Sequence, residues 1–357
     1  MNYIGSKLSL LPFLDESISK VVKNLPNDAT FCDLFSGTAS VGKYFKKKGY
    51  HIIANDLQYY SYVLSRQYIG NHTELKFNGL KNIWQNYSQD LFTDRTALIC
   101  AYLDNLQGIE GFVYNNFCKG NHKENEDYRL YFSDENGKKC DVIRTQIETW
   151  FVEKKINEDE YYFLLTTLLE NIDKVANTTS VYGAFLKHIK KSAQKTLIMK
   201  PCEMIYNKNE HNVYNEDANI LIHKIKTDIL YLDPPYNSRQ YSANYHVLET
   251  IARYDNPILY GKTGMRDYSK QKSEYCTKAK VISAFEDLIM NADAKYIFLS
   301  YNNEGLMSFE DIEKIMSKRG EYGYFEKKYS RFQADTKKHR NIKANSTTEY
   351  LHYVICR

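Results

Sequence analysis

Four consecutive residues, Asp233-Pro234-Pro235-Tyr236, carry the groups needed to hold a planar amine. They follow the apolar run 228–232, which is typical of a buried strand. Two successive prolines end a strand and hold the backbone extended, so the turn is rigid. The Asp233 carboxylate and a backbone carbonyl can accept both N–H bonds of an amino group, and the Tyr236 ring can stack on its planar face. The segment therefore predicts a site for a nucleobase with an exocyclic amine.

A second chemical pattern lies near the N-terminus. The run 31–35 is expected to form a short buried strand, and a loop of small residues (36–40) leads from it into a helix. The next strand, 51–54, ends at Asn55-Asp56. In doubly wound sheets, small residues in such a loop let the backbone approach an adenosyl ligand, and an acid at the tip of the second strand binds the ribose hydroxyls. This β-loop-α-β unit therefore predicts an adenosyl-binding site.

The remaining elements must bring these two patterns together. Helical spacing of apolar residues predicts a helix over 8–25, and the stretch 79–195 is expected to be an inserted, mostly helical module with a helix over 182–191. After it we expect a strand at 228–232, a helix at 245–252, a strand at 296–299, a helix ending at Gly320, and antiparallel strands at 324–332 and 349–356. This order predicts an α/β fold with a doubly wound, mostly parallel sheet and C-terminal antiparallel strands.

Length and composition limit the class of protein. The 357 residues are enough for one large domain with an insertion, or for two domains. No apolar run approaches the about 18 residues of a membrane span, and a polar Gly5-Ser6-Lys7 stands where a signal peptide would be, so we expect a cytoplasmic protein without a membrane partner. The seven cysteines are odd in number and lack CxxC spacing, which argues against a zinc ribbon or a disulfide scaffold and for a reducing compartment. No metal is expected.

The charge of the chain is compatible with a nucleic-acid partner. The net charge of +4 permits a polyanion without requiring one. Lysines and arginines are concentrated in two stretches, 262–280 and 314–343. Each stretch is either a solvated face or a contact with nucleic acid, and composition does not decide between the two.

In motif order, and over nearly its whole length, the chain resembles the Dam-like, alpha-class DNA adenine-N6 methyltransferases. The segments that carry the resemblance are Tyr3-Ile4-Gly5-Ser6-Lys7, the glycine-rich loop 33–42, the ribose acid in Asn55-Asp56, the adenine-contacting pair Glu216-Asp217 and the tetrapeptide 233–236. The loop departs from the common pattern, because Ala39 stands where glycine is usual. A methyl group there is tolerated if the backbone φ is negative.

The resemblance implies a sheet of the S-adenosylmethionine-dependent methyltransferase type, S-adenosylmethionine as methyl donor, and an adenine in double-stranded DNA as acceptor. It also implies a division of the chain into three segments. Residues 1–78 would form the first part of the catalytic domain, 79–195 an inserted target-recognition domain, and 196–357 the second part of the catalytic domain. The enzyme would serve a restriction-modification system with a cognate restriction endonuclease, or act as a solitary methylase.

The resemblance further implies roles for individual residues. Asp233 and the Pro234 carbonyl would accept the amine hydrogens of a base swung out of the duplex, Pro235 would stiffen the turn, and Tyr236 would stack on the base. The predicted cofactor contacts are Tyr3, Lys7, Asp33, Phe35, Gly37, Asp56, Asp217 and Asp233. Simpler readings remain open: Tyr3 as a packing residue, Lys7 as a surface charge, Asp217 as a helix cap. An acid at 233 turned inward and locked to a cation would contradict the assigned role.

Two loops are predicted to contact DNA: 237–243, just after the tetrapeptide, and the basic stretch 262–280. Arg239 is a candidate for a phosphate or base contact. Tyr241 and Tyr245 are candidates to fill the space that a flipped base leaves. His246, on the following helix, is expected to be structural.

Three alternative functions share part of this pattern. RNA guanine-N2 methyltransferases use a similar tetrapeptide, but their small members lack the N-terminal motif and the long insertion. Protein-glutamine methyltransferases normally begin the tetrapeptide with Asn, which disfavours them here. A silent DNA-binding subunit of a restriction assembly is disfavoured by the intact Lys7, Asp56, Asp233 and Tyr236. Methyl transfer to adenine in DNA is therefore the preferred interpretation.

Overall fold

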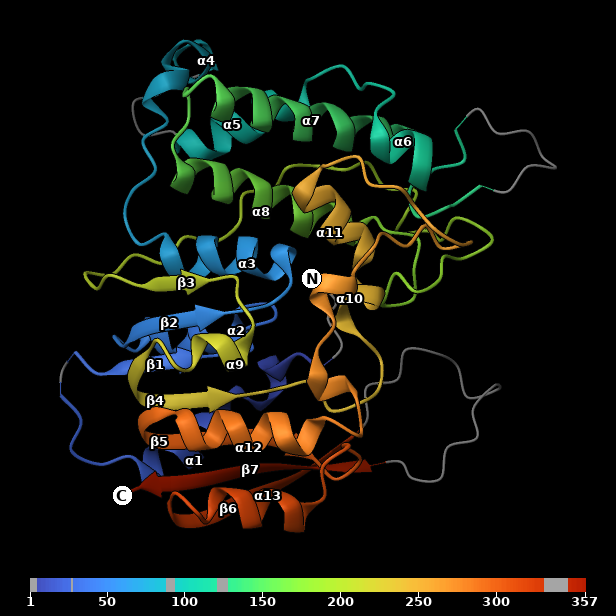
Figure 1. Ribbon diagram of the computed structural model, residues 1–357. Coiled ribbons are helices and arrows are strands. Elements are labelled where there is room, and N and C mark those ends of the chain that lie inside the picture. The colour runs from blue at the N-terminus through green and yellow to red at the C-terminus, as the bar shows by residue number, and fades with distance from the viewer. Residues whose placement is uncertain (1–4, 27, 88–93, 121–127, 331–345) are drawn as a thin grey trace. The chain divides into compact units, whose positions relative to one another are not determined.

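The computed structural model describes residues 5–26, 28–87, 94–120, 128–330 and 346–357 (Figure 1). The chain divides into two compact units. The sheet unit comprises 5–65, 207–242 and the described part of 269–357, and the helical unit comprises the described part of 66–206 together with 243–268. The insertion predicted at 79–195 lies within the helical unit, which also takes in 66–78, 196–206 and 243–268.

The sheet unit is built on a seven-stranded sheet with strand order β3-β2-β1-β4-β5-β7-β6. The strands are β1 Thr30–Asp33, β2 His51–Asn55, β3 Asn212–Tyr214, β4 Lys226–Leu232, β5 Asp293–Asn302, β6 Gly320–Ser330 and β7 Ser346–Cys356. The first five run parallel, and β7 is antiparallel to both β5 and β6. The predicted fold class, a doubly wound and mostly parallel sheet with antiparallel C-terminal strands, is confirmed.

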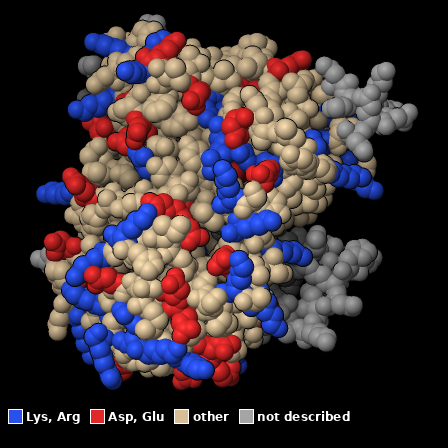
Figure 2. Space-filling model, viewed as in Figure 1, with Lys and Arg blue, Asp and Glu red and all other residues tan. Residues whose placement is uncertain are grey.

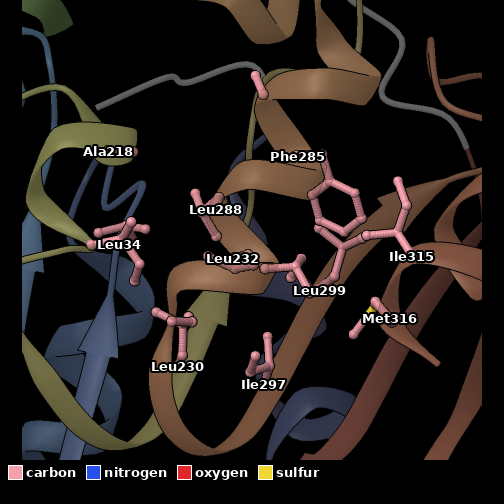
Figure 3. Packing of buried hydrophobic residues seen from close by; sticks show 14 of the residues in the cluster. Leu34, Ala218, Leu230, Leu232, Phe285, Leu288, Ile297, Leu299, Ile315 and Met316 are labelled. Carbon is pink, nitrogen blue, oxygen red and sulfur yellow. The ribbon is translucent and has the colours of Figure 1, made fainter. Parts of the chain in front are cut away.

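Helices cover both faces of this sheet, because its central strands are apolar on both sides. On one face, Phe31 of β1 stacks on Phe45 of α2 (Ser40–Lys47), with ring centroids 4.0 Å apart. The N-terminal η1 (Lys7–Leu10) and α1 (Leu11–Val21) lie on the same face. The opposite face buries Leu230, Leu232, Ile297 and Leu299 against further helices (Figure 3). Those helices are α9 Ala218–Leu221, α12 Val281–Asn291 and α13 Phe309–Met316.

Shorter elements complete the sheet unit. They are α3 Tyr59–Ser65, η4 Ser269–Gln271 and η5 Glu274–Cys276, while α10 Tyr241–Asn244 begins in this unit. The helix predicted over 8–25 begins as the 3-10 turn η1 and ends at Val21. The short edge strand β3 has a polar sequence and was not predicted.

The helical unit packs its helices around α7 and α8. Its elements are the π-helix η2 Arg66–Gly70, η3 Asn78–Leu80, α4 Lys81–Tyr87, α5 Arg95–Asp104, α6 Phe112–Phe117, α7 Asp134–Val152, α8 Glu158–Lys174 and α11 His246–Arg253. A capping box between Asn157 and Glu160 begins α8. The buried Arg144 of α7 donates to the carbonyls of Ile251 and Ala252 and so joins α7 to α11. No helix of the described ranges is long and apolar enough to cross a membrane.

The predicted helix over 182–191 is wrong, since this segment forms turns and irregular backbone. Its polar groups bond to neighbouring segments instead of to a helical ladder. The buried Tyr182 donates its hydroxyl to Asp173, and its N–H donates to the carbonyl of Asn244. The side chain of Asn177 donates to the carbonyl of Leu186. Tertiary hydrogen bonds have replaced the local helical pattern.

Candidate active site

The carboxyl ends of β1 and β4 lie side by side in the sheet, at the point where the strand order reverses direction. In open α/β sheets, ligands bind outside the carboxyl ends of the strands at this switch point. Asp33 is the last residue of β1, and Asp233 directly follows β4. The topology therefore brings one carboxylate from each predicted chemical pattern to the same edge of the sheet.

Asp233 is held by one ion pair. Its Oδ1 atom lies 3.2 Å from Nζ of Lys7, and its side chain is 19% exposed. Its Oδ2 atom makes no hydrogen bond with any residue in the described ranges. A cation thus contacts the carboxylate without occupying both of its oxygens, and Oδ2 stays available as an acceptor. Burial raises the pKa of Asp233 to about 6, since the Lys7 charge only partly opposes it.

Lys7 is shared between two carboxylates. Its ammonium lies 2.5 Å from Oε1 of Glu349 on β7, and both side chains are buried. Ser300 of β5 donates its hydroxyl to the same Oε1 atom at 2.6 Å. Burial alone would lower the pKa of Lys7, but the charges of Asp233 and Glu349 together raise it well above its ordinary value. Lys7 is therefore a buried cation in the sheet unit, and the surface-charge reading is wrong.

The tetrapeptide turn is fixed against the N-terminal segment. The carbonyl of Tyr236 accepts a hydrogen bond from the Leu306 N–H at 3.1 Å, while its half-buried ring packs partly on the core. A Cβ atom at Gly5 would lie 3.8 Å from this ring and 3.1 Å from the hydroxyl of Tyr241. Gly5 also has φ +80°, so only glycine fits easily here. Pro234 is buried and Pro235 half-buried in the same turn.

The glycine-rich loop is tied down by two acids. The N–H of Gly37 donates to Oδ2 of Asp56 at 2.8 Å, and the N–H of Gly42 donates to Oδ2 of Asp33 at 2.9 Å. Ala39 has φ +58°, in the left-handed region, so the negative torsion that would accommodate its methyl group is absent. At Ala39 the loop therefore adopts a left-handed backbone conformation that glycine normally occupies.

The buried carboxyl of Asp33 has a raised pKa. Burial raises its pKa to about 7, the hydrogen bond from Gly42 opposes the rise, and the nearby charges of Asp233 and Asp56 add to it. Its ionised form therefore lacks a compensating positive charge. A cationic group bound at this edge of the sheet would supply that charge.

Of the other predicted cofactor residues, Phe35 and Asp217 lie in the same unit. Asp217 caps α9 through Oδ1, which accepts the N–H of Asn219 at 2.9 Å, so its predicted alternative role as a helix cap is observed. The half-buried Phe35 ring meets Tyr275 edge-on, with centroids 5.2 Å apart. Tyr3 lies outside the described residues.

The predicted DNA contacts have different environments. Arg239 is exposed, and its guanidinium forms no hydrogen bond or ion pair with a described residue. Tyr241 is half-buried, whereas Tyr245 is fully buried in the helical unit, which argues against a contact of its ring with DNA. His246 is also fully buried, and its ring nitrogens contact the carbonyls of Ala243 and Thr263, as expected for a structural residue.

Some cations of the two basic stretches are paired within their own units. Arg266 forms two contacts with Asp255, and Lys280 pairs with Glu274 at 2.7 Å. Lys318 pairs with Glu286, and residues 331–343 of the second stretch lie outside the described ranges. On the face drawn in Figure 2, the blue side chains are interspersed with red ones.

Residues that the sequence reasoning missed are buried and polar. Glu349 and Ser300 belong to the ion-pair cluster around Lys7. The side-chain amide of Asn55 donates to the carbonyls of Leu34 and Glu216 and so links two segments. A glutamate at the start of the mostly apolar run 349–356 was the available signal for Glu349. Across the described residues, no group of three or more His, Cys, Asp or Glu side chains is arranged to hold a metal ion.

The sheet is doubly wound and carries two carboxylates at its switch point, where open α/β sheets bind their ligands. A family model, D12 class N6 adenine-specific DNA methyltransferase, matches residues 3–315. The chain belongs to this family and is an adenine-specific DNA methyltransferase.

Curated relatives match the chain along its whole length. The type II methyltransferase M.NlaIII of Neisseria lactamica is 51% identical over 99% of this chain and 98% of its own length. M.CviAII of Paramecium bursaria Chlorella virus 1 is 36% identical, again over 99% and 98%. M.FokI of Planomicrobium okeanokoites is 40% identical over 99% of this chain, which spans only 52% of that longer protein.

Proposed function

We propose that the chain transfers the methyl group of S-adenosylmethionine to the exocyclic N6 amine of an adenine flipped out of double-stranded DNA at a specific site. The observation that carries this proposal is the position of Asp233. It stands at the switch point beside Asp33, with Oδ2 free to accept a hydrogen bond. The family to which the chain belongs supplies the base and the reaction.

The acids at the sheet edge fit a donor with a positive charge. When bound, S-adenosylmethionine supplies an electrophilic methyl group on a sulfonium centre. The ionised form of Asp33 gains a favourable partner in such a cation, because burial otherwise raises its pKa to about 7. Gly37 brings backbone close to this edge without a side chain, and Asp56 holds it there. We assign the donor to Tyr3, Lys7, Asp33, Phe35, Gly37, Asp56, Asp217 and Asp233.

The tetrapeptide would prepare the amine for attack. The adenine amine is a poor nucleophile, because its lone pair is delocalised into the ring. Two acceptors, Oδ2 of Asp233 and the carbonyl of Pro234, would hold its hydrogens and favour a pyramidal nitrogen with its lone pair directed at the methyl group. As the N–C bond forms and the C–S bond breaks, the nitrogen becomes cationic and must lose one proton. Asp233, with a pKa of about 6, is placed to stabilise that charge and to accept the proton.

Stacking would hold the flipped base. The ring of Tyr236 is half-buried and packs partly on the hydrophobic core, so it can serve as a platform for a planar base. Such stacking is worth about 1–3 kcal/mol per base. Arg239 and Tyr241, on the loop that follows, are the residues we assign to DNA, since Arg239 is exposed and its guanidinium forms no hydrogen bond or ion pair with a described residue.

The relatives carry the names of type II and modification methylases. We infer that this chain acts in the same way, as the modification enzyme of a restriction-modification system with a cognate endonuclease in the cytoplasm. Methylation by such an enzyme protects the host sequence that the endonuclease would cut.

The experiment that tests the proposal compares acceptors directly. Labelled S-adenosylmethionine is incubated with the purified chain and with duplex DNA, RNA or protein. Label is expected in duplex DNA at the N6 position of adenine, and Asp233→Ala is expected to bind the donor but to transfer no label. Label in RNA or protein alone, or near-normal transfer by Asp233→Ala, contradicts the proposal.

A further inference from the structure

Glu349 is a buried carboxylate in an apolar sheet. It lies on β7 opposite Asn302 of β5 and is 1% exposed. Its Oε1 atom accepts from Lys7 and from Ser300, but its Oε2 atom has no hydrogen-bond partner in the part of the chain that the structure describes. An unsatisfied buried carboxylate oxygen is costly, and native proteins contain few of them.

Stability alone is a poor explanation for this group. A buried ion pair often contributes less than well-packed apolar side chains of the same volume, because both charges lose their hydration. The neighbouring buried residue on this face of β7 is Leu351, so the carboxylate has an apolar neighbour on its own strand. The position therefore points to a role connected with what Lys7 contacts, namely Asp233.

We propose that Glu349 is a positioning residue for methyl transfer, which draws the Lys7 ammonium toward β7 and so leaves Asp233 only partly neutralised and free to accept the adenine amine. The distances agree, since Lys7 Nζ is 2.5 Å from Glu349 and 3.2 Å from Asp233. The inference rests on the proposed function, because it concerns the same carboxylate.

Glu349 changes the charge balance between Lys7 and Asp233. With Lys7 alone, the whole positive charge of the ammonium would neutralise the Asp233 carboxylate. A neutralised carboxylate is a weaker acceptor for a further hydrogen bond than one that keeps part of its negative charge. With Glu349 present, one positive charge is divided between two negative ones. The other groups that face the cluster are Asp33, whose charge couples to Asp233, the hydroxyl of Ser300, and Tyr231, whose pKa is raised well above its usual value by burial so that it stays neutral.

Three influences set the pKa of Asp233. Burial raises it, Lys7 lowers it and Glu349 raises it. Glu349→Gln keeps an oxygen that accepts from Lys7 and Ser300 but removes the negative charge. The pKa of Asp233 should then fall, and the acid limb of the pH dependence of kcat should move to lower pH by about one unit. The plateau of kcat should fall about tenfold, with the KM for donor and DNA nearly unchanged.

Three further variants separate positioning from folding. Glu349→Met removes the charge with a similar volume, and its acid limb should move in the same direction. Glu349→Asp keeps the charge, and its acid limb should stay at the wild-type position. Glu249→Gln is the matched control, because Glu249 is also 1% exposed and paired with a cation, Arg253, in the helical unit. It should change stability without moving the acid limb.

A second readout does not depend on turnover. The pKa of Asp233 is measured in the ligand-free protein from the carboxyl carbon shift of isotope-labelled aspartate by NMR, assigned with Asp233→Asn. It should be lower in Glu349→Gln than in the wild type. An unchanged pKa and an unmoved acid limb in a folded Glu349→Gln overturn the inference, whereas a wild-type protein that methylates no DNA overturns the proposed function instead.

Discussion

The carboxylate of Asp56 accepts a hydrogen bond from the backbone N–H of Gly37 at 2.8 Å, across the gap between the loop after β1 and the end of β2. Its other oxygen, Oδ1, accepts the N–H of Gln58, also at 2.8 Å. Gly37 has φ +50°, a conformation that glycine adopts at no steric cost. One carboxylate thus fixes the loop on which the proposed donor site depends.

Asp56→Asn should weaken donor binding. An amide has one accepting oxygen, so either Gly37 or Gln58 loses its acceptor. We expect the Kd for S-adenosylmethionine to rise at least about tenfold, measured by isothermal titration calorimetry. Asp228→Asn is the control, because Asp228 also accepts a backbone N–H, from Thr30 at 2.9 Å, but does so at the start of β4. Equal losses of donor affinity in both variants would remove the special role of Asp56.

Asp33→Asn should stabilise the protein at high pH and weaken donor binding. The pKa of Asp33 is raised from an ordinary 3.8 to about 7 in the folded state, so between these values the folded protein binds more protons than the unfolded chain. Stability therefore falls as pH rises from about 4 to about 7. The asparagine oxygen can still accept the Gly42 N–H, but the variant lacks this pH-dependent loss.

The measurement is urea unfolding of both proteins at pH 5 and pH 8. The variant should gain stability relative to the wild type by on the order of 2 kcal/mol more at pH 8 than at pH 5. Its affinity for S-adenosylmethionine should fall, because no ionised carboxylate remains at 33 to meet the sulfonium. A difference in stability that is the same at both pH values would show that Asp33 does not titrate in this range.

Tyr236→Ala should impair turnover far more than duplex binding. The ring is proposed to contact the base only after flipping, so its loss should lower kcat/KM by about 5–150-fold, equivalent to about 1–3 kcal/mol of stacking. Tyr236→Phe keeps the stacking face and should retain most activity. Duplex affinity, measured by fluorescence anisotropy, should change by less than about threefold in either variant. Parallel losses of binding and turnover in Tyr236→Ala would contradict the assignment.

The sequence predicted the parts of the molecule whose signals are local. The strands around β1, β2, β4 and β5 are short apolar runs bounded by turn residues, and Asp233 follows its strand directly. Such patterns depend on neighbours in the chain, so they can be read without the fold.

The parts that were missed depend on contacts between distant residues. Glu349 contacts Lys7, 342 positions away, and no spacing rule connects the two. The segment 182–191 has helical spacing but is held by Asn177 and Asp173, which lie outside it. Ala39 was expected to need a negative φ, and its left-handed conformation is imposed by the bonds of the surrounding loop.

Arg239→Ala should weaken DNA binding, and the loss should come mainly from the salt-dependent part of the binding free energy. Arg239 is exposed, and its guanidinium forms no hydrogen bond or ion pair with a described residue, so its charge is available for a phosphate. Neutralised phosphates release counterions, so the slope of log K against log salt should become less steep by about one unit. Lys20→Ala, which removes an exposed lysine paired with Glu16 on α1, should leave the slope unchanged. An Arg239→Ala slope equal to that of the wild type would exclude the phosphate contact.

Ala39→Gly should leave stability almost unchanged, whereas Ala54→Gly should reduce it. Both alanines are fully buried, and both replacements lose a buried methyl group and make the unfolded chain more flexible, at about 0.8 and 0.4–1 kcal/mol. Only Ala39, with φ +58°, gains relief from a left-handed conformation worth about 1–2 kcal/mol. The difference in unfolding free energy between the two variants, measured in urea, isolates that strain. If both replacements destabilise the protein equally, the left-handed conformation of Ala39 costs nothing.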